Sequence, residues 1–213
     1  MASTEISNFF IPGPAGKLEV LSENFADVPK GVLVVCHPHP LHGGTMHNKV
    51  VHTLVRTGHE LGLTTLRFNY RGVEKSEGSY DEGNGETDDL LAVIDWLDDH
   101  FAATPLWLAG FSFGAYVAMR ASTLRPAQQL ITVAPAVNLV RFEGLKLPDC
   151  PWLLIQGTQD EIVPFNEVVD WVGKLNTPPE TVYFDDVGHF FHGQLVNLRQ
   201  TLVDKLSDKA AAL

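Results

Sequence analysis

One short segment of the chain combines a nucleophilic side chain with glycines at a fixed spacing. Ser112 lies between Gly110 and Gly114, with a phenylalanine on each side of it. The residues before this segment, 105–109, form a short apolar run, and the residues after it, 115–121, include no glycine or proline. We therefore expect a buried strand, a sharp turn that carries the serine, and a helix. The glycines let strand and helix approach closely, and the turn pushes the serine hydroxyl outward, as nucleophilic catalysis requires.

A serine hydroxyl is a weak nucleophile unless a neighbouring base, itself oriented by a third group, takes its proton. Two later loops supply such groups, and each loop directly follows an apolar strand-like run. Asp160 lies in the loop after residues 152–156, and His189 lies in the loop after residues 181–184. Because the carboxyl ends of parallel strands meet at one edge of a sheet, both groups would lie near Ser112. We predict that Ser112 is the nucleophile, His189 the base and Asp160 the orienting acid.

Both partner assignments have alternatives within the same loops. For the acid the alternatives are Glu161, which is adjacent to Asp160, and the more remote Asp186. For the base the alternative is His192, which lies where the last helix is expected to begin and suits a helix cap. We prefer His189 because it follows the glycine at the loop tip, and Asp160 because it follows its strand on a glycine-led turn.

The segment 110–114 resembles the nucleophile elbow of serine α/β-hydrolases, and the resemblance covers roughly residues 31–205. The segments 37–50 and 67–72 narrow the resemblance to small, lidless bacterial α/β-hydrolases related to the dienelactone-hydrolase and prolyl-oligopeptidase-like groups. Dienelactone hydrolases use a cysteine nucleophile, whereas this chain has Ser112 at that position. The resemblance implies an acyl-enzyme mechanism, which needs no metal and no organic cofactor.

Acyl transfer develops negative charge on the carbonyl oxygen, and two backbone N–H groups usually stabilise it in an oxyanion hole. The resemblance implies that one N–H belongs to the residue after the nucleophile, Phe113, and the other to the loop after the first central strand. In that loop Pro38 and Pro40 lack an N–H. His39 is therefore the expected second donor, and Leu41 is the alternative.

The same loop region holds five histidines in sixteen residues, which raises the possibility of a metal site. No Cys, Asp or Glu lies among these histidines. His47 and His52 are five residues apart, which differs from the spacing of a helical zinc pair. We therefore expect no metal, and instead a rigid polar loop at the pocket edge with His37 hydrogen-bonded in the interior.

Other polar and aromatic residues near the expected site receive structural assignments. Arg67, Asn69 and Arg71 would suit an anionic substrate, but we expect them to tie neighbouring loops together. Several aromatic residues flank the site in sequence and are expected mainly to pack in the core: Phe111, Phe113, Tyr116, Phe190 and Phe191.

Apolar strand-like runs alternate with amphipathic helical patterns, which predicts a three-layer α/β/α sandwich with a mostly parallel sheet of about seven or eight strands. The expected strands cover residues 6–11, 18–21, 31–37, 64–70, 105–109, 130–137, 152–156 and 181–184. The expected helices cover residues 48–61, 86–100, 115–121, 166–175 and 194–205. We predict a single domain, residues 1–213. The segment 138–151, where many α/β-hydrolases insert a lid, has only fourteen residues, so we expect no lid.

Composition excludes several classes of protein. The net charge of −11 argues against nucleic-acid partners, because a phosphate backbone needs basic patches. No apolar run is long enough to cross a bilayer, and residues 1–10 do not form a leader, so we expect a cytoplasmic protein. The two cysteines give no disulfide framework, and Cys36 is expected to be a buried free thiol.

These residues predict a serine hydrolase that cleaves small-molecule carboxylic esters or thioesters with short or exposed acyl groups. A peptidase, an acyltransferase or a depalmitoylating thioesterase would use the same three side chains. A non-catalytic α/β-hydrolase-like protein that binds a small ligand is the remaining alternative. The presence of Ser112, Asp160 and His189 together argues against that alternative.

Overall fold

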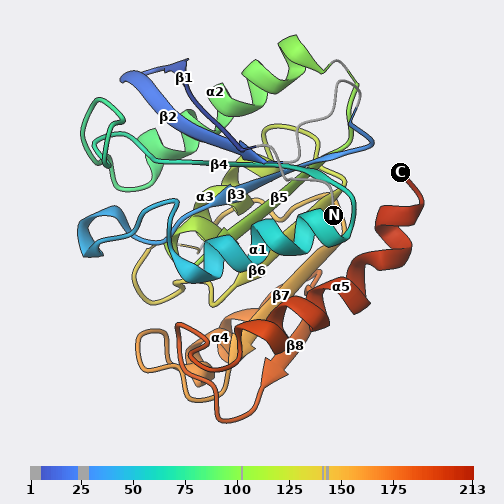
Figure 1. Cartoon of the computed structure of the whole chain (residues 1–213). Helices are drawn as coiled ribbons and strands as arrows, with labels where there is room; N and C mark the ends of the chain where they lie inside the picture. Colours follow the sequence, from blue (N-terminus) through green and yellow to red (C-terminus); the bar gives the residue numbers. More distant parts are fainter. Residues whose placement is uncertain (1–5, 24–28, 102, 141, 143) are drawn as a thin grey trace.

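The computed structural model describes residues 6–23, 29–101, 103–140, 142 and 144–213, which form an eight-stranded sheet between layers of helices (Figure 1). The strands are β1 (Ile6–Gly13), β2 (Gly16–Glu23), β3 (Val32–Cys36), β4 (Thr64–Phe68), β5 (Leu106–Phe111), β6 (Gln129–Val133), β7 (Trp152–Gly157) and β8 (Glu180–Phe184). The helices are α1 (Lys49–Glu60), α2 (Asn84–His100), α3 (Phe113–Ser122), α4 (Phe165–Val172) and α5 (Leu195–Ala211), with a short 3₁₀ helix, η1 (Pro40–His42). The fold is the α/β/α sandwich that the sequence predicts.

The strand order is β1-β2-β4-β3-β5-β6-β7-β8. Strands β3 to β8 run parallel, whereas the β1–β2 hairpin is antiparallel and joins the sheet through β4. The carboxyl ends of parallel strands meet at one edge of the sheet, where ligands bind in open α/β folds. The loops after β3, β5, β7 and β8 therefore meet at that edge, with β5 in the centre of the sheet.

Successive residues of the central strands pack into separate cores on the two faces of the sheet. On β5, Leu108 packs with Ile94 of α2 and Val117 of α3. Its neighbour Ala109 packs on the opposite face, in the cluster that includes Leu202 of α5. Helices α2, α3 and α4 thus cover one face, and α1 and α5 cover the other. A strand that is buried on both faces has a continuous apolar sequence, which is why the apolar runs predicted these strands.

Most element boundaries differ by one to three residues from the sequence expectation, and two differ by more. Strand β6 ends at Val133 rather than at residue 137, because Ala134 adopts a left-handed φ of 46°, which is not an extended conformation. Helix α5 extends to Ala211, beyond the expected end at residue 205, because Leu206 and Ala210 continue its buried stripe. In the segment 138–151, the described residues, which exclude 141 and 143, form no helix or strand, so the sheet carries no lid at this position.

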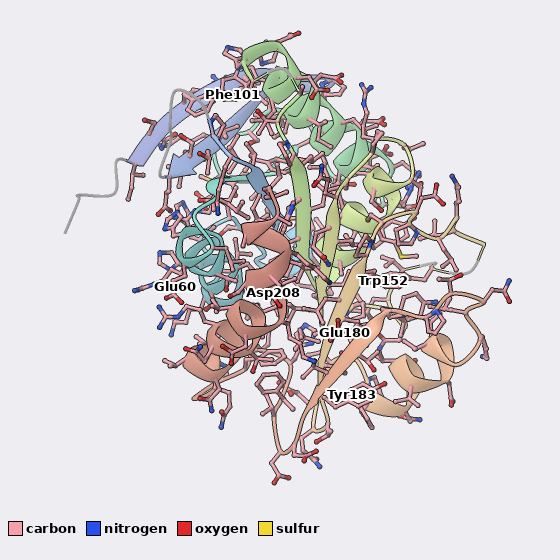
Figure 2. All side chains as sticks on the ribbon, turned by 90° about the vertical axis from the view of Figure 1, so that its right-hand side faces the viewer. Glu60, Phe101, Trp152, Glu180, Tyr183 and Asp208 are labelled. Carbon is pink, nitrogen blue, oxygen red and sulfur yellow. The ribbon has the colours of Figure 1, made fainter. Side chains whose placement is uncertain are left out.

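Strand β8 forms one edge of the sheet, where Glu180 and Tyr183 are exposed (Figure 2). Lys205 of α5 bonds Glu180 at 2.8 Å and ties the last helix to this strand. Both cysteines are free, and burial raises the pKa of the Cys36 thiol to about 12. No helix in the described part of the chain has the length and apolar character needed to span a membrane.

Candidate active site

Ser112 occupies a strained turn between β5 and α3. Its backbone has φ 57° and ψ −115°, a conformation that a non-glycine residue rarely adopts. A Cβ atom on Gly110 would lie 2.0 Å from the carbonyl oxygen of Gly114, and a Cβ on Gly114 would lie 2.3 Å from the carbonyl oxygen of Cys36. Only glycine fits at both positions, so the two glycines allow strand and helix to meet at the serine.

The side chains of Ser112, His189 and Asp160 form a continuous chain of hydrogen bonds. The serine Oγ lies 3.1 Å from Nε2 of the imidazole, and Nδ1 of the imidazole lies 2.8 Å from Oδ2 of the carboxylate. With an ionised acid, Nδ1–H donates to the carboxylate and Nε2 accepts from the serine hydroxyl. Each of the three residues is at most 7% exposed. Burial shields these bonds from competing water and strengthens them.

Asp160 has a partner at each carboxylate oxygen. Oδ1 accepts the N–H groups of Ile162 at 2.9 Å and Val163 at 2.7 Å. Oδ2 accepts from Nε2 of Gln156 at 2.9 Å as well as from His189. Burial by itself raises the pKa of this carboxyl, but the hydrogen bonds and charge of His189 and the backbone N–H groups outweigh burial. The pKa of Asp160 therefore lies below its ordinary value of 3.8, and the acid is ionised at neutral pH.

The alternative acids and the alternative base lie outside this chain of bonds. Glu161 accepts the backbone N–H of His189 at 3.0 Å, so it positions the histidine loop and not the imidazole. Asp186 is exposed, and its N–H bonds the hydroxyl of Thr158 at 3.1 Å. His192 is also exposed. Of the sequence candidates, the structure brings only Asp160 and His189 into the chain that starts at the serine.

The two expected oxyanion donors lie in neighbouring segments. Phe113 is the first residue of α3, and the His39 ring packs against the Phe113 ring with centroids 4.9 Å apart. The alternative donor, the N–H of Leu41, already bonds Nδ1 of His39 at 3.2 Å. The hydroxyl of Tyr80 lies 3.2 Å from Nε2 of the same imidazole. Contacts at both ring nitrogens therefore hold the His39 segment beside the start of α3.

Comparisons with known proteins agree with this geometry. A family model described as serine aminopeptidase, S33, matches residues 27–145, more than half of the chain. A solved α/β serine hydrolase homologue from Coxiella burnetii is 48% identical, with a TM-score of 0.90 over 94% of this chain and 97% of that chain. The chain belongs to the α/β serine hydrolase family.

Two further relatives of this hydrolase cover most of its length. A solved α/β serine hydrolase without a lid, from Xanthomonas campestris, is 43% identical, with a TM-score of 0.89 over 95% of this chain and 94% of that chain. An uncharacterized protein of Rickettsia prowazekii is 32% identical over 207 residues, which cover 92% of this chain and 87% of that protein. The matches thus extend over both the β1–β2 side and the α5 side of the hydrolase.

His37 has the interior role that the sequence indicated. It is fully buried, its Nδ1 lies 2.7 Å from the carbonyl oxygen of Pro38, and its Nε2 accepts the N–H of Tyr70 at 3.2 Å. Burial lowers the pKa of His37 to about 3, so the imidazole is neutral. Among the described residues of the hydrolase, no group of three or more His, Cys, Asp or Glu side chains could hold a metal ion.

The three polar residues in and after β4 have structural partners, as expected, but Arg67 and Arg71 bond residues of β2 and α2 rather than of loops. Arg67 bonds Glu23 at 2.7 Å, and Arg71 bonds Asp89 at 2.8 Å. Asn69 accepts the backbone N–H of Met46 at 2.9 Å and so holds the loop that precedes α1. These groups have structural partners within the hydrolase.

The expected core assignment holds for four of the five aromatic residues that flank the site. Phe111, Phe113, Tyr116 and Phe191 are buried. Phe190 is 36% exposed, and its ring centroid lies 5.1 Å from that of His189. Phe190 therefore forms part of the surface beside the imidazole.

Sequence reasoning missed Gln156 and Tyr80. Gln156 is the second-last residue of β7 and is fully buried in an otherwise apolar strand. A polar side chain at such a position indicates that it has a hydrogen-bond partner. Tyr80 lies in a polar loop, and nothing in the local pattern indicates its contact with His39.

A hollow of about 780 Å³ lies between the segment after β6 and helix α4. Its lining includes Val137, Leu145 and Trp171, but not Ser112, His189 or Asp160. Val137 follows Ala136, whose N–H lies 3.4 Å from the carbonyl oxygen of Ser112, so the hollow begins next to the elbow.

Proposed function

We propose that this hydrolase cleaves carboxylic esters or thioesters that carry short or exposed acyl groups. Ser112 is the nucleophile, His189 the general base and acid, and Asp160 the group that orients the imidazole. The observation that carries the proposal is the hydrogen-bond chain of 3.1 Å and 2.8 Å through the imidazole. Membership of the α/β serine hydrolase family supports hydrolytic chemistry at this serine.

In the first half of the reaction, Oγ of Ser112 attacks the acyl carbon while Nε2 of His189 takes the hydroxyl proton. The resulting imidazolium donates Nδ1–H to the ionised Asp160. The carbonyl oxygen becomes an oxyanion, which accepts hydrogen bonds from the N–H groups of Phe113 and His39. His189 then gives its proton to the leaving alcohol or thiol, the bond from the acyl carbon to that group breaks, and an acyl-serine remains.

Water completes the cycle. His189 takes a proton from the water molecule, whose oxygen attacks the acyl-serine carbon. The second tetrahedral intermediate collapses, the proton returns to Oγ of Ser112, and the carboxylic acid leaves. The short segment after β6 provides no lid to cover a long acyl chain, which is why we favour short or exposed acyl groups.

Amide cleavage is the second candidate, because the matching family model carries an aminopeptidase description. The same three side chains serve both reactions, and only the leaving group differs. An amine is a poorer leaving group than an alcohol or a thiol, so protonation by His189 must then precede its departure. A panel of p-nitrophenyl esters, thioesters and aminoacyl p-nitroanilides with matched acyl groups separates the two candidates.

The decisive test is labelling with a fluorophosphonate probe, followed by mass spectrometry of the adduct. We expect one adduct, on Ser112, and turnover of p-nitrophenyl acetate that falls about 10⁶-fold in Ser112→Ala, as for other serine nucleophiles. Ser207→Ala is the matched control, since Ser207 is exposed on α5 and its hydroxyl donates to the carbonyl oxygen of Val203 in the same helix at 2.6 Å. A folded wild-type protein that takes up no probe would contradict the proposal and favour a ligand-binding protein.

A further inference from the structure

A groove of about 460 Å³ runs between helices α1 and α5, and cationic side chains line it. Helix α1 contributes Lys49, His52 and Arg56, and helix α5 contributes Arg199. The first three are three and four residues apart, a spacing that places them on one face of a helix. The apolar Val196 completes the α5 wall and is 69% exposed. The groove therefore has basic side chains along α1 and an apolar side chain on α5.

The charge of this groove is opposite to that of the whole protein. The chain has a net charge of −11, yet no Asp or Glu lines the groove. Arg199 pairs with Glu60 at 2.9 Å, which neutralises one of the cations. Lys49 and Arg56 make no ion pair with any carboxylate in the described part of the chain. Two cations are thus left for an anionic ligand.

His52 also lines the groove, and the pKa of its imidazole is lowered. Partial burial is the largest cause, the positive charge of Arg67 lowers the pKa further, and Glu23 acts in the opposite direction. The positive charge of the groove therefore rests on its lysine and arginine side chains rather than on His52.

The groove opens at the edge of the sheet that carries the serine. Lys49 is the first residue of α1, directly after the loop that holds His39, and Leu195 is the first residue of α5, directly after the loop that holds His189. Both helices begin at the carboxyl ends of parallel strands, where Ser112 also lies. They run side by side on one face of the sheet (Figure 1). The groove and the serine therefore lie at the same edge of the sheet.

The spacing of the cations indicates the chemistry of the ligand. Lys49 and Arg56 are seven residues apart on α1, which corresponds to about 10 Å along the helix. That distance exceeds the width of a single carboxylate and suits a ligand that carries more than one phosphate group. Guanidinium groups bind phosphate oxygens through paired N–H donors, and lysine binds them as a point charge.

We propose that the α1–α5 groove binds phosphate on the leaving group of the substrate, so that the preferred substrates are acyl esters or thioesters of a phosphorylated alcohol or thiol. This inference rests on the proposed function, because it assigns the leaving group of that reaction. The acyl carbon lies at Ser112, and the phosphate-bearing part of the leaving group lies along Lys49 and Arg56.

The test compares two thioesters with the same acyl group. Butyryl-coenzyme A carries phosphates on its thiol, whereas butyryl-N-acetylcysteamine has the same thioester and no phosphate. We expect kcat/KM for the phosphorylated substrate to exceed that for the neutral one more than tenfold at low salt, and the ratio to fall as salt rises. In Arg56→Gln and in Lys49→Gln the ratio should fall about fivefold to tenfold, the size of one charge-assisted contact.

Arg125→Gln is the matched control, because Arg125 is an exposed arginine that pairs with Asp95 outside the groove. Its ratio should equal that of the wild type. A wild-type ratio near one, or a ratio that Arg56→Gln leaves unchanged, would overturn the inference while the proposed function stands. Absence of hydrolysis with both thioesters and with p-nitrophenyl acetate would instead remove the proposed function.

Inorganic phosphate distinguishes a leaving-group site from a site for a free anion. If the groove holds the leaving group, phosphate should raise KM for butyryl-coenzyme A competitively and leave KM for the neutral thioester unchanged. Phosphate that binds the protein, detected by a shift in Tm, without any preference for the phosphorylated thioester would show a free-anion site and would overturn the inference.

Discussion

Replacement of Asp160 by Asn keeps the shape of the side chain and changes only its donors and acceptors. In the structure, Oδ1 accepts two backbone N–H groups, those of Ile162 and Val163, at 2.9 and 2.7 Å. Oδ2 faces Nδ1 of His189 at 2.8 Å. An asparagine has a single oxygen and can occupy only one of these places. Since the two backbone donors cannot become acceptors, the oxygen takes the Oδ1 place and the NH₂ group faces the imidazole.

The NH₂ group then donates to Nδ1, and the proton of the neutral imidazole moves to Nε2. That nitrogen faces Oγ of Ser112 at 3.1 Å and can no longer accept the serine proton. In serine proteases the corresponding substitution lowers kcat about 10⁴-fold through the wrong tautomer, which corresponds to about 5.5 kcal/mol of transition-state stabilisation. We expect a loss of about 10³- to 10⁴-fold in kcat for Asp160→Asn, with KM little changed.

The fold should survive the substitution. Nε2 of Gln156 donates to Oδ2 in the wild type, so the new NH₂ group of the asparagine would face another hydrogen-bond donor. Rotation of the Gln156 amide lets its Oε1, which has no partner among the described residues, accept from the asparagine. The same rotation takes Nε2 away from the carbonyl oxygens of Gly157 and Val163, which lie 3.3 and 3.4 Å from it. We therefore expect nearly unchanged circular dichroism and a lowered Tm.

The assay is kcat and KM for a short p-nitrophenyl ester, with the rate of fluorophosphonate labelling measured in parallel. Asp186→Asn is the matched control, because Asp186 is exposed and has a φ of 57°, which asparagine adopts readily. It should retain wild-type kcat. If kcat of Asp160→Asn stays within about tenfold of wild type, well short of the loss that a wrong tautomer causes, the reasoning about the imidazole is refuted.

Two further predictions concern the fold around the site. In Gly114→Ala the new Cβ would lie 2.3 Å from the carbonyl oxygen of Cys36, so we expect soluble expression and probe labelling to be lost. The control is Gly173→Ala, which should behave as wild type because Gly173 has a φ of −63°. An active Gly114→Ala protein would contradict the close approach of the two backbones. His37 is neutral in the folded state because burial lowers its pKa from 6.5 to about 3, so its stabilising effect is complete above pH 6.5 and is lost as pH falls toward 3. At pH 5 the loss should be about 2 kcal/mol in urea unfolding, and His37→Asn should remove that part of the pH dependence. A pKa of His37 near 6.5, measured by NMR titration of the folded protein, would contradict this prediction.

The order of the site residues could be predicted because each follows a parallel strand. Ser112, Asp160 and His189 come after β5, β7 and β8, and parallel strands end at one edge whatever their separation in sequence. The strands themselves were readable because burial on both faces leaves an uninterrupted apolar run, as at Leu108 and Ala109. The glycines at 110 and 114 were readable because only a residue without a Cβ allows the approach that the turn needs.

Contacts between separate loops could not be predicted in this way. Glu161 is 28 residues from His189, and its bond to the histidine N–H depends on how the two loops fold at the sheet edge. The same holds for Tyr80 and His39, which are 41 residues apart. A pattern along the chain records which residues are buried, but it does not record which polar side chains meet across loops. For this reason Glu161 was readable as a candidate acid and not as a group that positions a backbone.

A hydrolase without a lid must recognise its substrate with the surfaces that border the edge of the sheet. Those surfaces differ between the two faces of this protein. The hollow beside α4 lies on the face covered by α3 and includes the aromatic Trp171, whereas the α1–α5 groove lies on the opposite face and includes Lys49 and Arg56. The central strand β5 ends between the faces, so a hollow with both apolar and charged lining lies on one side of the sheet and a basic groove on the other. Under the proposed function, this asymmetry would give the acyl group and the leaving group chemically different surroundings, and a few side chains on α1 would suffice to select the leaving group.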